Sequence, residues 1–310
     1  MSPAAWTRVN ERGSLAGLWL TAFVYRIFGR RLSEWFVLPI VAYFFLTDRR
    51  GRRASRRYLD RLYALPAGAA ALGHPPTSRD CFRHYRQFAL ATVDRLRFTV
   101  DGGDVEIVLR GREHFTPLLA AKRGAVLLGA HLGSFDALRI LAAREGIVVN
   151  VLMVTRHAPR INAVLRRLNP EVDFRVIEPG SDAIDTVSRL RACLEQGEFV
   201  AILADRVGAA ARSRVVRVPF LGWPAPLPLG PFVLAAALGC PMLFLVGLRR
   251  TPTRYEVFAE RLADPVRMSS SDRAGQLAEL ARRYADRLGA YCVEAPYQWF
   301  NFFDFWGEDR

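Results

Sequence analysis

The sequence predicts an α/β protein in which a central, mostly parallel sheet is covered by helices on both faces. Three observations predict this fold. From residue 101 onward, apolar runs with strand character alternate with helical patterns. Most of these runs are apolar throughout, as is typical of strands buried on both faces. Finally, the chain has 310 residues, 51% of them hydrophobic, which is enough for a large core.

The first hundred residues predict a helical subdomain. Apolar residues recur at helical spacing over Leu15–Phe28, and a more apolar helix is expected over Leu32–Thr47, after Gly29. Its apolar stretch, Trp35–Leu46, is about 12 residues long, whereas a helix that spans a bilayer needs about 20. A cluster of arginines follows it. This order is typical of a helix that lies in a membrane surface, and a buried core helix is an equal alternative.

The remaining elements follow from periodicity and from turn-forming residues. Ala64–Pro76, rich in Ala, Gly and Pro, is expected to be a loop, and Arg79–Phe98 a helix. The expected strands are Val105–Leu109, Ala125–Gly129, Val148–Val154, Phe174–Ile177, Phe199–Leu203, Met242–Leu248 and Tyr255–Phe258. The expected helices are Phe135–Arg144, Ile161–Leu168, Asp182–Gln196, Pro231–Leu238 and Ser271–Tyr291. No linker separates these elements, so we expect a helical, membrane-associating subdomain over residues 1–100 and an α/β core with an aromatic tail over 101–310.

The chain is strongly basic, with 44 Lys and Arg against 30 Asp and Glu and a net charge of +14. Such a charge attracts a polyanion, either nucleic acid or an anionic membrane surface. The arginines are dispersed and no aromatic and basic recognition module is present, so no nucleic-acid partner is expected. The excess of apolar residues favours the membrane surface. Met1–Arg12 lacks the pattern of a secretory signal.

No metal and no bound cofactor are expected. The four cysteines are scattered without a CxxC pair, which is typical neither of a zinc site nor of a disulfide framework. The sequence also lacks a phosphate-binding glycine-rich loop of the P-loop or dinucleotide type.

The stretch Gly124–Arg139, GAVLLGAHLGSFDALR, carries the candidate chemistry. A buried strand ends just before His131, which places this residue at the carboxyl edge of the sheet, where α/β proteins bind ligands. Ser134 is expected to cap the following helix and not to act as a nucleophile, because a G-x-S-x-G elbow is absent. We expect Asp136 to accept a hydrogen bond from one imidazole nitrogen, leaving the other to take a proton from a hydroxyl.

Further polar candidates follow other strands. Arg206, next to Asp205, is expected either to bind an anionic group or to help hold an oxyanion, and the equal alternative is an Asp205–Arg206 pair that braces a loop. Asp205 as a second acid or base is a further alternative. Arg156 is a weaker candidate of the same kind, for which a surface cation is the favoured interpretation.

Two aromatic features also have two interpretations each. Phe220 and Trp223 are candidates to line an acyl groove, although plain core packing is the more common role for such residues. The aromatic run Trp299–Trp306 suits either a membrane-interface belt or a tail packed on the helical subdomain.

Several sequence blocks resemble one known family. HLGSFD is similar to the H-x4-[D/E] motif of the glycerolipid acyltransferases, and most similar to that of the lipid A late (lauroyl/myristoyl) acyltransferases. VAILADR, VPFLG, PLGP and APYQWFNFFDFW resemble further blocks of that family in order, and the resemblance spans about Gly13 to Trp306. The aromatic ending resembles a subgroup of predicted acyltransferases associated with glycosyltransferases and aryl-polyene-type lipids.

We expect peripheral attachment to the cytoplasmic face of the inner membrane through Leu15–Leu46 and the neighbouring arginines. The resemblance implies that the protein is an O-acyltransferase. Its donor would be an acyl carrier protein thioester, with acyl-CoA as the alternative, and its acceptor a hydroxyl of a lipid or glycolipid. It implies His131 as general base and Asp136 as the residue that orients it; many relatives carry Glu at the second position, and both acids can orient an imidazole. A thioesterase using the same base and a non-catalytic membrane-surface protein remain alternatives.

Overall fold

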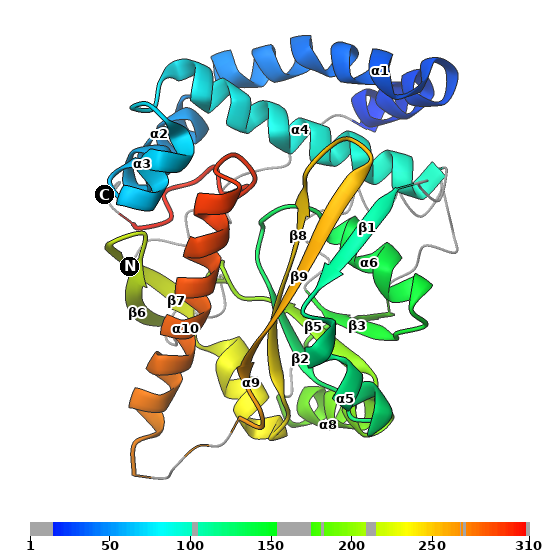
Figure 1. Ribbon diagram of the computed structural model, residues 1–310, viewed down its shortest axis with the longest axis vertical. Coiled ribbons are helices and arrows are strands. Elements are labelled where there is room, and N and C mark those ends of the chain that lie inside the picture. The colour runs from blue at the N-terminus through cyan, green and yellow to red at the C-terminus, as the bar shows by residue number, and fades with distance from the viewer. Residues whose placement is uncertain are drawn as a thin grey trace. The chain divides into compact units, whose positions relative to one another are not determined.

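A computed structural model describes residues 15–100, 105–153, 175–180, 183–208, 215–266, 268 and 271–307 (Figure 1). Its contacts divide the chain into two compact units. Glu106–Val154 and Phe174–Ala290 belong to a sheet unit, and Ala5–Val105 and Tyr291–Arg310 to a helical unit. Each unit is described by itself.

The sheet unit is built on a 7-stranded sheet with the order β1-β9-β8-β2-β5-β3-β4. Its strands are β1 (Glu106–Arg110), β2 (Val126–Gly129), β3 (Val149–Leu152), β4 (Arg175–Ile177), β5 (Phe199–Leu203), β8 (Met242–Arg249) and β9 (Arg254–Ala263). Only the β8–β9 pair is antiparallel among these described strands. The predicted mostly parallel sheet is therefore confirmed.

Helices cover both faces of this sheet, as β8 demonstrates. Neighbouring residues of a strand point to opposite faces. Leu243 packs in a cluster with Phe115 and Leu118, at the start of and within α5 (Thr116–Ala120). The ring of Phe244 instead lies 5.6 Å from that of Tyr284 in α10 (Arg273–Glu294). The other helical elements of this unit are η2 (Arg112–His114), α6 (Phe135–Arg144), α8 (Ala183–Glu195) and α9 (Gly230–Leu238).

The sequence did not predict a separate hairpin formed by β6 (Val215–Phe220) and β7 (Trp223–Pro228). Its turn places Leu221 and Gly222 at φ 50° and 85°, the left-handed conformation that two-residue hairpin turns require. Both strands contain proline, which is rare inside sheets and therefore weakens the strand signal.

The helical unit contains α1 (Leu15–Thr47), α2 (Arg49–Tyr63), α3 (Pro66–Leu72) and α4 (Ser78–Val100). Two helices were expected in place of α1, and Gly29 (φ 68°, ψ −170°) does interrupt it at the predicted position. The loop expected over Ala64–Pro76 was wrong. α3 forms there because Pro66 suits the first turn of a helix, alanines favour the interior, and Gly73 ends it in a left-handed conformation.

One side of α1 packs on α4, and the other is exposed. Val37 and Val41 are buried in a cluster with Tyr85 and Val93 of α4. On the exposed side, Trp35 and other large apolar side chains face outward. None of the helices within the described residues is long and apolar enough to cross a membrane. The predicted helix Ile161–Leu168 lies outside the described residues.

The C-terminal aromatic tail belongs to the helical unit and is buried there. Trp299 is fully buried, with its ring centroid 5.0 Å from that of Tyr58 in α2. The Arg61 guanidinium stacks 4.0 Å from the Trp306 ring. Figure 1 shows this tail, in red, beside α2 and α3. Of the two interpretations of this aromatic run, the structure shows the packed tail.

Candidate active site

His131 and Asp205 follow neighbouring parallel strands at matching positions. In the β2–β5 ladder, Gly129 is paired with Leu203. His131 lies two residues beyond Gly129, and Asp205 two residues beyond Leu203. Because parallel strands run in step, residues at equal distances past their ends meet at the same edge of the sheet. The sheet therefore brings together an imidazole and a carboxylate that are 74 residues apart in the chain.

The Asp205 carboxylate makes two hydrogen bonds to His131. Its Oδ1 lies 2.8 Å from the imidazole Nδ1, and its Oδ2 accepts a bond of 2.9 Å from the backbone N–H. A carboxylate only accepts, so Nδ1 carries the proton. Nε2 then presents its lone pair, and it makes no hydrogen bond to any other described residue. Asp205 thus fixes both the tautomer and the orientation of the ring.

A tight crossing next to β8 sets the chain direction after His131. Gly133 has φ +73°, and a Cβ added to it would lie 2.0 Å from the carbonyl oxygen of Gly247. The N–H of Ser134 donates to that same oxygen at 2.7 Å. The Ser134 hydroxyl then accepts from the N–H of Ala137 at 3.2 Å, so Ser134 is the helix cap that the sequence predicted.

The surroundings of His131 favour its neutral, basic form. Its side chain is 25% exposed, whereas that of Asp205 is fully buried. Burial lowers the pKa of His131 below its usual value, and nearby Arg206 lowers it further, while Asp205 partly offsets both. Burial alone would raise the pKa of Asp205, but its bonds to His131 and the charge of Arg206 hold it well below its usual range. The pair therefore combines an ionised carboxylate with a base that is ready at neutral pH.

The predicted pairing of Asp136 with His131 differs from the arrangement found, in which Asp205 occupies Nδ1. Asp136 lies in the first turn of α6, as expected, and its carboxylate is 3.9 Å from Nε of Arg139. The cause is the strand order. Sequence proximity suggested Asp136, but the adjacent strand β5 delivers a carboxylate in direct register with the histidine.

The remaining candidates are placed as follows. Arg206 is next to the pair, and burial lowers its pKa to about 10, with Asp205 opposing that shift. Phe220 is buried; a Cβ added to Gly289 of α10 would lie 3.9 Å from its ring. Trp223 is half-buried at the start of β7. Arg156 lies outside the described residues.

A metal site is not apparent in the part of the chain that the structure describes, since no three His, Cys, Asp or Glu side chains are grouped to hold an ion. The pairing of Asp205 with His131 was not predicted, because the sequence does not state which strands are neighbours. The signal that could have found it is the similar ending of two apolar strands, AVLLGAH and FVAILAD, each followed by a group able to take part in proton transfer.

Comparisons with known proteins show the family to which the chain belongs. The profile of the family described as bacterial lipid A biosynthesis acyltransferase matches residues 88–307, which include both His131 and Asp205. The chain is also similar to a phosphatidylinositol mannoside acyltransferase of Mycobacterium tuberculosis. The two are 24% identical over 263 residues, which cover 80% of this chain and 75% of that protein. The match covers well over half of the chain, so this protein belongs to the bacterial lipid A biosynthesis acyltransferase family and is an acyltransferase of lipid or glycolipid acylation.

Proposed function

We propose that this protein is an O-acyltransferase that moves a fatty acyl group from a carrier thioester to a hydroxyl of a lipid or glycolipid. The observation that carries the proposal is the His131–Asp205 pair at the carboxyl edge of the sheet, with Nδ1 held and Nε2 directed away from the carboxylate. An alcohol is too weak an acid to attack a thioester unaided, and an oriented imidazole supplies the missing basicity.

The reaction proceeds in two proton-coupled steps. Nε2 of His131 takes the hydroxyl proton as the acceptor oxygen bonds to the thioester carbonyl carbon, which forms a tetrahedral oxyanion. The oxyanion then collapses, the carbon–sulfur bond breaks, and the imidazolium returns its proton to the departing thiolate. The products are an ester and a free thiol. Asp205 acts as a positioning residue that also stabilises the imidazolium.

Arg206 is the candidate to stabilise negative charge near this pair. It follows Asp205 directly, and its guanidinium lowers the pKa of both His131 and Asp205, so its positive charge is felt at the reacting base. A fixed cation in a buried site favours a developing oxyanion more than the neutral carbonyl that precedes it.

The donor and acceptor classes are inferred from the family and from the relative. We expect acyl carrier protein as the donor, with acyl-CoA as the alternative, and no bound cofactor. The relative is by its name an acyltransferase for phosphatidylinositol mannoside, which supports a glycolipid acceptor here. Lipid acceptors reside in bilayers, so we place the protein at the cytoplasmic face of the inner membrane. Attachment through the exposed apolar side of α1 fits this location.

Product analysis tests this function. Purified protein is incubated with labelled acyl carrier protein, or acyl-CoA, and a membrane lipid extract, and the lipids are separated and weighed by mass spectrometry. A new acylated lipid is expected. Release of free fatty acid without any acylated lipid would identify a thioesterase. An untouched thioester with either donor would mean either that the extract lacks the acceptor or that the protein is a non-catalytic relative.

A further inference from the structure

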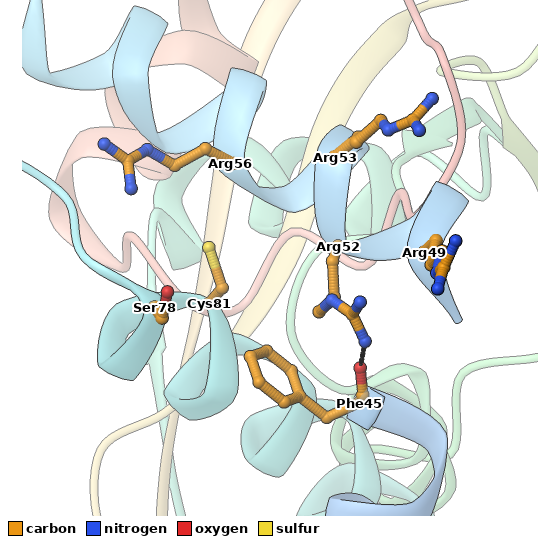
Figure 2. A pocket seen from close by; sticks show the side chains of 7 residues that line it. All are labelled: Phe45, Arg49, Arg52, Arg53, Arg56, Ser78 and Cys81. Carbon is orange, nitrogen blue, oxygen red and sulfur yellow. Dashed lines mark hydrogen bonds between the residues drawn. The ribbon is translucent and has the colours of Figure 1, made fainter. Parts of the chain in front are cut away.

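A strongly cationic pocket of about 350 Å³ lies within the helical unit (Figure 2). Four arginines of α2 line it: Arg49, Arg52, Arg53 and Arg56. Phe45 of α1 and Ser78 and Cys81 of α4 complete the lining, so it contains no acidic side chain. Figure 2 shows Arg52 directed toward Phe45, whereas Arg53 and Arg56 extend to either side of α2.

Two of the four guanidinium groups are already engaged within the protein. Arg52 donates to the backbone carbonyl of Phe45 and, at 2.6 Å, to that of Leu46, which satisfies the end of α1. Arg56 forms an ion pair of 2.9 Å with Asp60. Arg49 and Arg53 are exposed and make no hydrogen bond or ion pair with any described residue.

The nearby carboxylate of Asp48 forms no ion pair with these four arginines and is engaged elsewhere. It caps α2 by accepting from the N–H of Gly51 at 3.0 Å, and it accepts from the hydroxyl of Tyr85 at 3.2 Å. The guanidinium groups at the pocket all carry positive charge, so each of them attracts an anion that enters it. Guanidinium groups match phosphate oxygens two at a time, and the Ser78 hydroxyl adds a neutral donor.

The exposed apolar side of α1 ends next to this pocket, which favours a phosphate that belongs to a membrane lipid. Leu32, Trp35, Tyr43 and Leu46 are spaced so that they share one side of the helix, and they are 53%, 71%, 62% and 70% exposed. Leu46 directly follows Phe45, a pocket residue. An apolar stripe that ends at a cluster of arginines is suited to a bilayer surface, where acyl chains and phosphates lie at adjacent depths.

We propose that this pocket binds the headgroup phosphate of an anionic phospholipid while the apolar stripe of α1 enters the bilayer surface. The proposal rests on the membrane attachment proposed above and not on acyl transfer. Arg49 and Arg53 are the principal ligands, since both are available, and Arg52 and Ser78 also line the pocket. The protein would then attach selectively to anionic membranes at a defined site.

Vesicle flotation with the full-length protein tests the proposal. Binding is measured to phosphatidylcholine vesicles with and without phosphatidylglycerol. The pocket variant Arg49→Gln/Arg53→Gln is compared with Arg50→Gln/Arg79→Gln, which removes the same charge from exposed arginines that do not line the pocket. Near an anionic surface each removed arginine weakens binding roughly fivefold, so the affinity of both variants for anionic vesicles should fall by this factor for each arginine removed. The pocket variant is expected to lose about tenfold more, because charged hydrogen bonds also disappear.

Equal losses in the two variants would overturn the proposal, since they would reduce the effect to the general charge of the protein. A Leu46→Gln variant should weaken binding to both kinds of vesicle, whereas the pocket variant should lose mainly its preference for phosphatidylglycerol. A thermal shift with inorganic phosphate, against chloride at equal ionic strength, separates the two sources of phosphate. If only the wild type is stabilised by free phosphate, and the pocket variant shows no extra loss on vesicles, the pocket serves a soluble anion and the lipid assignment is wrong.

The same flotation with His131→Ala protein separates this proposal from the enzymatic one. Pocket-dependent binding by that variant would support the pocket even if the acyl-transfer mechanism fails.

Discussion

His131 is held by Asp205 through both its ring and its backbone, at 2.8 Å to Nδ1 and 2.9 Å to the backbone nitrogen. A single buried carboxylate therefore fixes where the histidine lies and how its ring is turned. This relationship depends on β2 and β5 being neighbours, because the two residues follow those strands in register.

Replacing Asp205 is expected to reduce turnover far more than replacing Asp136. Asp205→Asn removes the charge that stabilises the imidazolium and allows the wrong tautomer, so kcat should fall roughly 10²- to 10⁴-fold. Asp136→Asn is the matched control, because it makes the same chemical change at a carboxylate that lies five residues after His131 in the sequence. Steady-state kinetics of the two variants compare the losses in kcat. A larger loss in Asp136→Asn than in Asp205→Asn would show that the sequence-based pairing describes the working enzyme.

The pH dependence of kcat/KM should report the lowered pKa of His131 in the free enzyme. The base must be neutral to work, so activity is lost as pH falls through its pKa, which burial places below the usual value near 6.5. In Asp205→Asn the offsetting carboxylate charge is gone, so the acidic limb should move to still lower pH. An acidic limb above pH 6.5 in the wild type, or a shift to higher pH in the variant, would contradict the assignment of His131.

His84 should make the stability of the helical unit sensitive to acid. It is fully buried; Nε2 donates to the carbonyl of Trp299 at 2.8 Å, and Nδ1 accepts from the Ser55 hydroxyl at 3.0 Å. Burial lowers its pKa to about 4, against 6.5 when unfolded. Between those values the unfolded chain binds a proton that the folded chain excludes, so stability falls as pH falls from 6.5 to 4, by about 3 kcal/mol in all. Urea unfolding at a series of pH values measures this, with His84→Gln as the variant in which that part of the slope should vanish.

Gly133→Ala is expected to disrupt the crossing that follows His131. The new Cβ would lie 2.0 Å from the Gly247 carbonyl oxygen at a backbone φ of +73°, so we expect a loss of about 3 kcal/mol or more. Gly146→Ala is the control, because its φ is +64° but nothing lies within 4 Å; only the backbone strain of about 1–2 kcal/mol should appear. Thermal unfolding compares the two, and equal losses would mean that close approach to β8 is unimportant.

Local signals were sufficient for many elements. β5 and α6 have the bounds that the sequence predicted. The uninterrupted apolar run of β5 and the serine-capped amphipathic pattern of α6 can each be recognised from neighbouring residues alone. The break at Gly29 is equally local, since a left-handed residue there costs a glycine little. The hairpin of β6 and β7 was missed because the prolines in both strands weaken the strand signal in the sequence.

Half of the candidate site could be predicted in the same way. His131 was identified from the strand that precedes it and from the helix cap that follows it. Asp205 was named only as a weak candidate, because strand order is set by the packing of the whole sheet and leaves no local trace in the sequence. The carboxylate nearest in sequence was therefore preferred over the one nearest in space.

The most direct test of the central claim is the rate of ester formation by His131→Ala, measured with saturating donor and acceptor on protein whose circular dichroism matches the wild type. Loss of the general base should lower that rate about 10²- to 10⁴-fold. A folded His131→Ala protein that forms the ester at the wild-type rate would contradict the account, because the pair at the edge of the sheet would then have no part in the reaction.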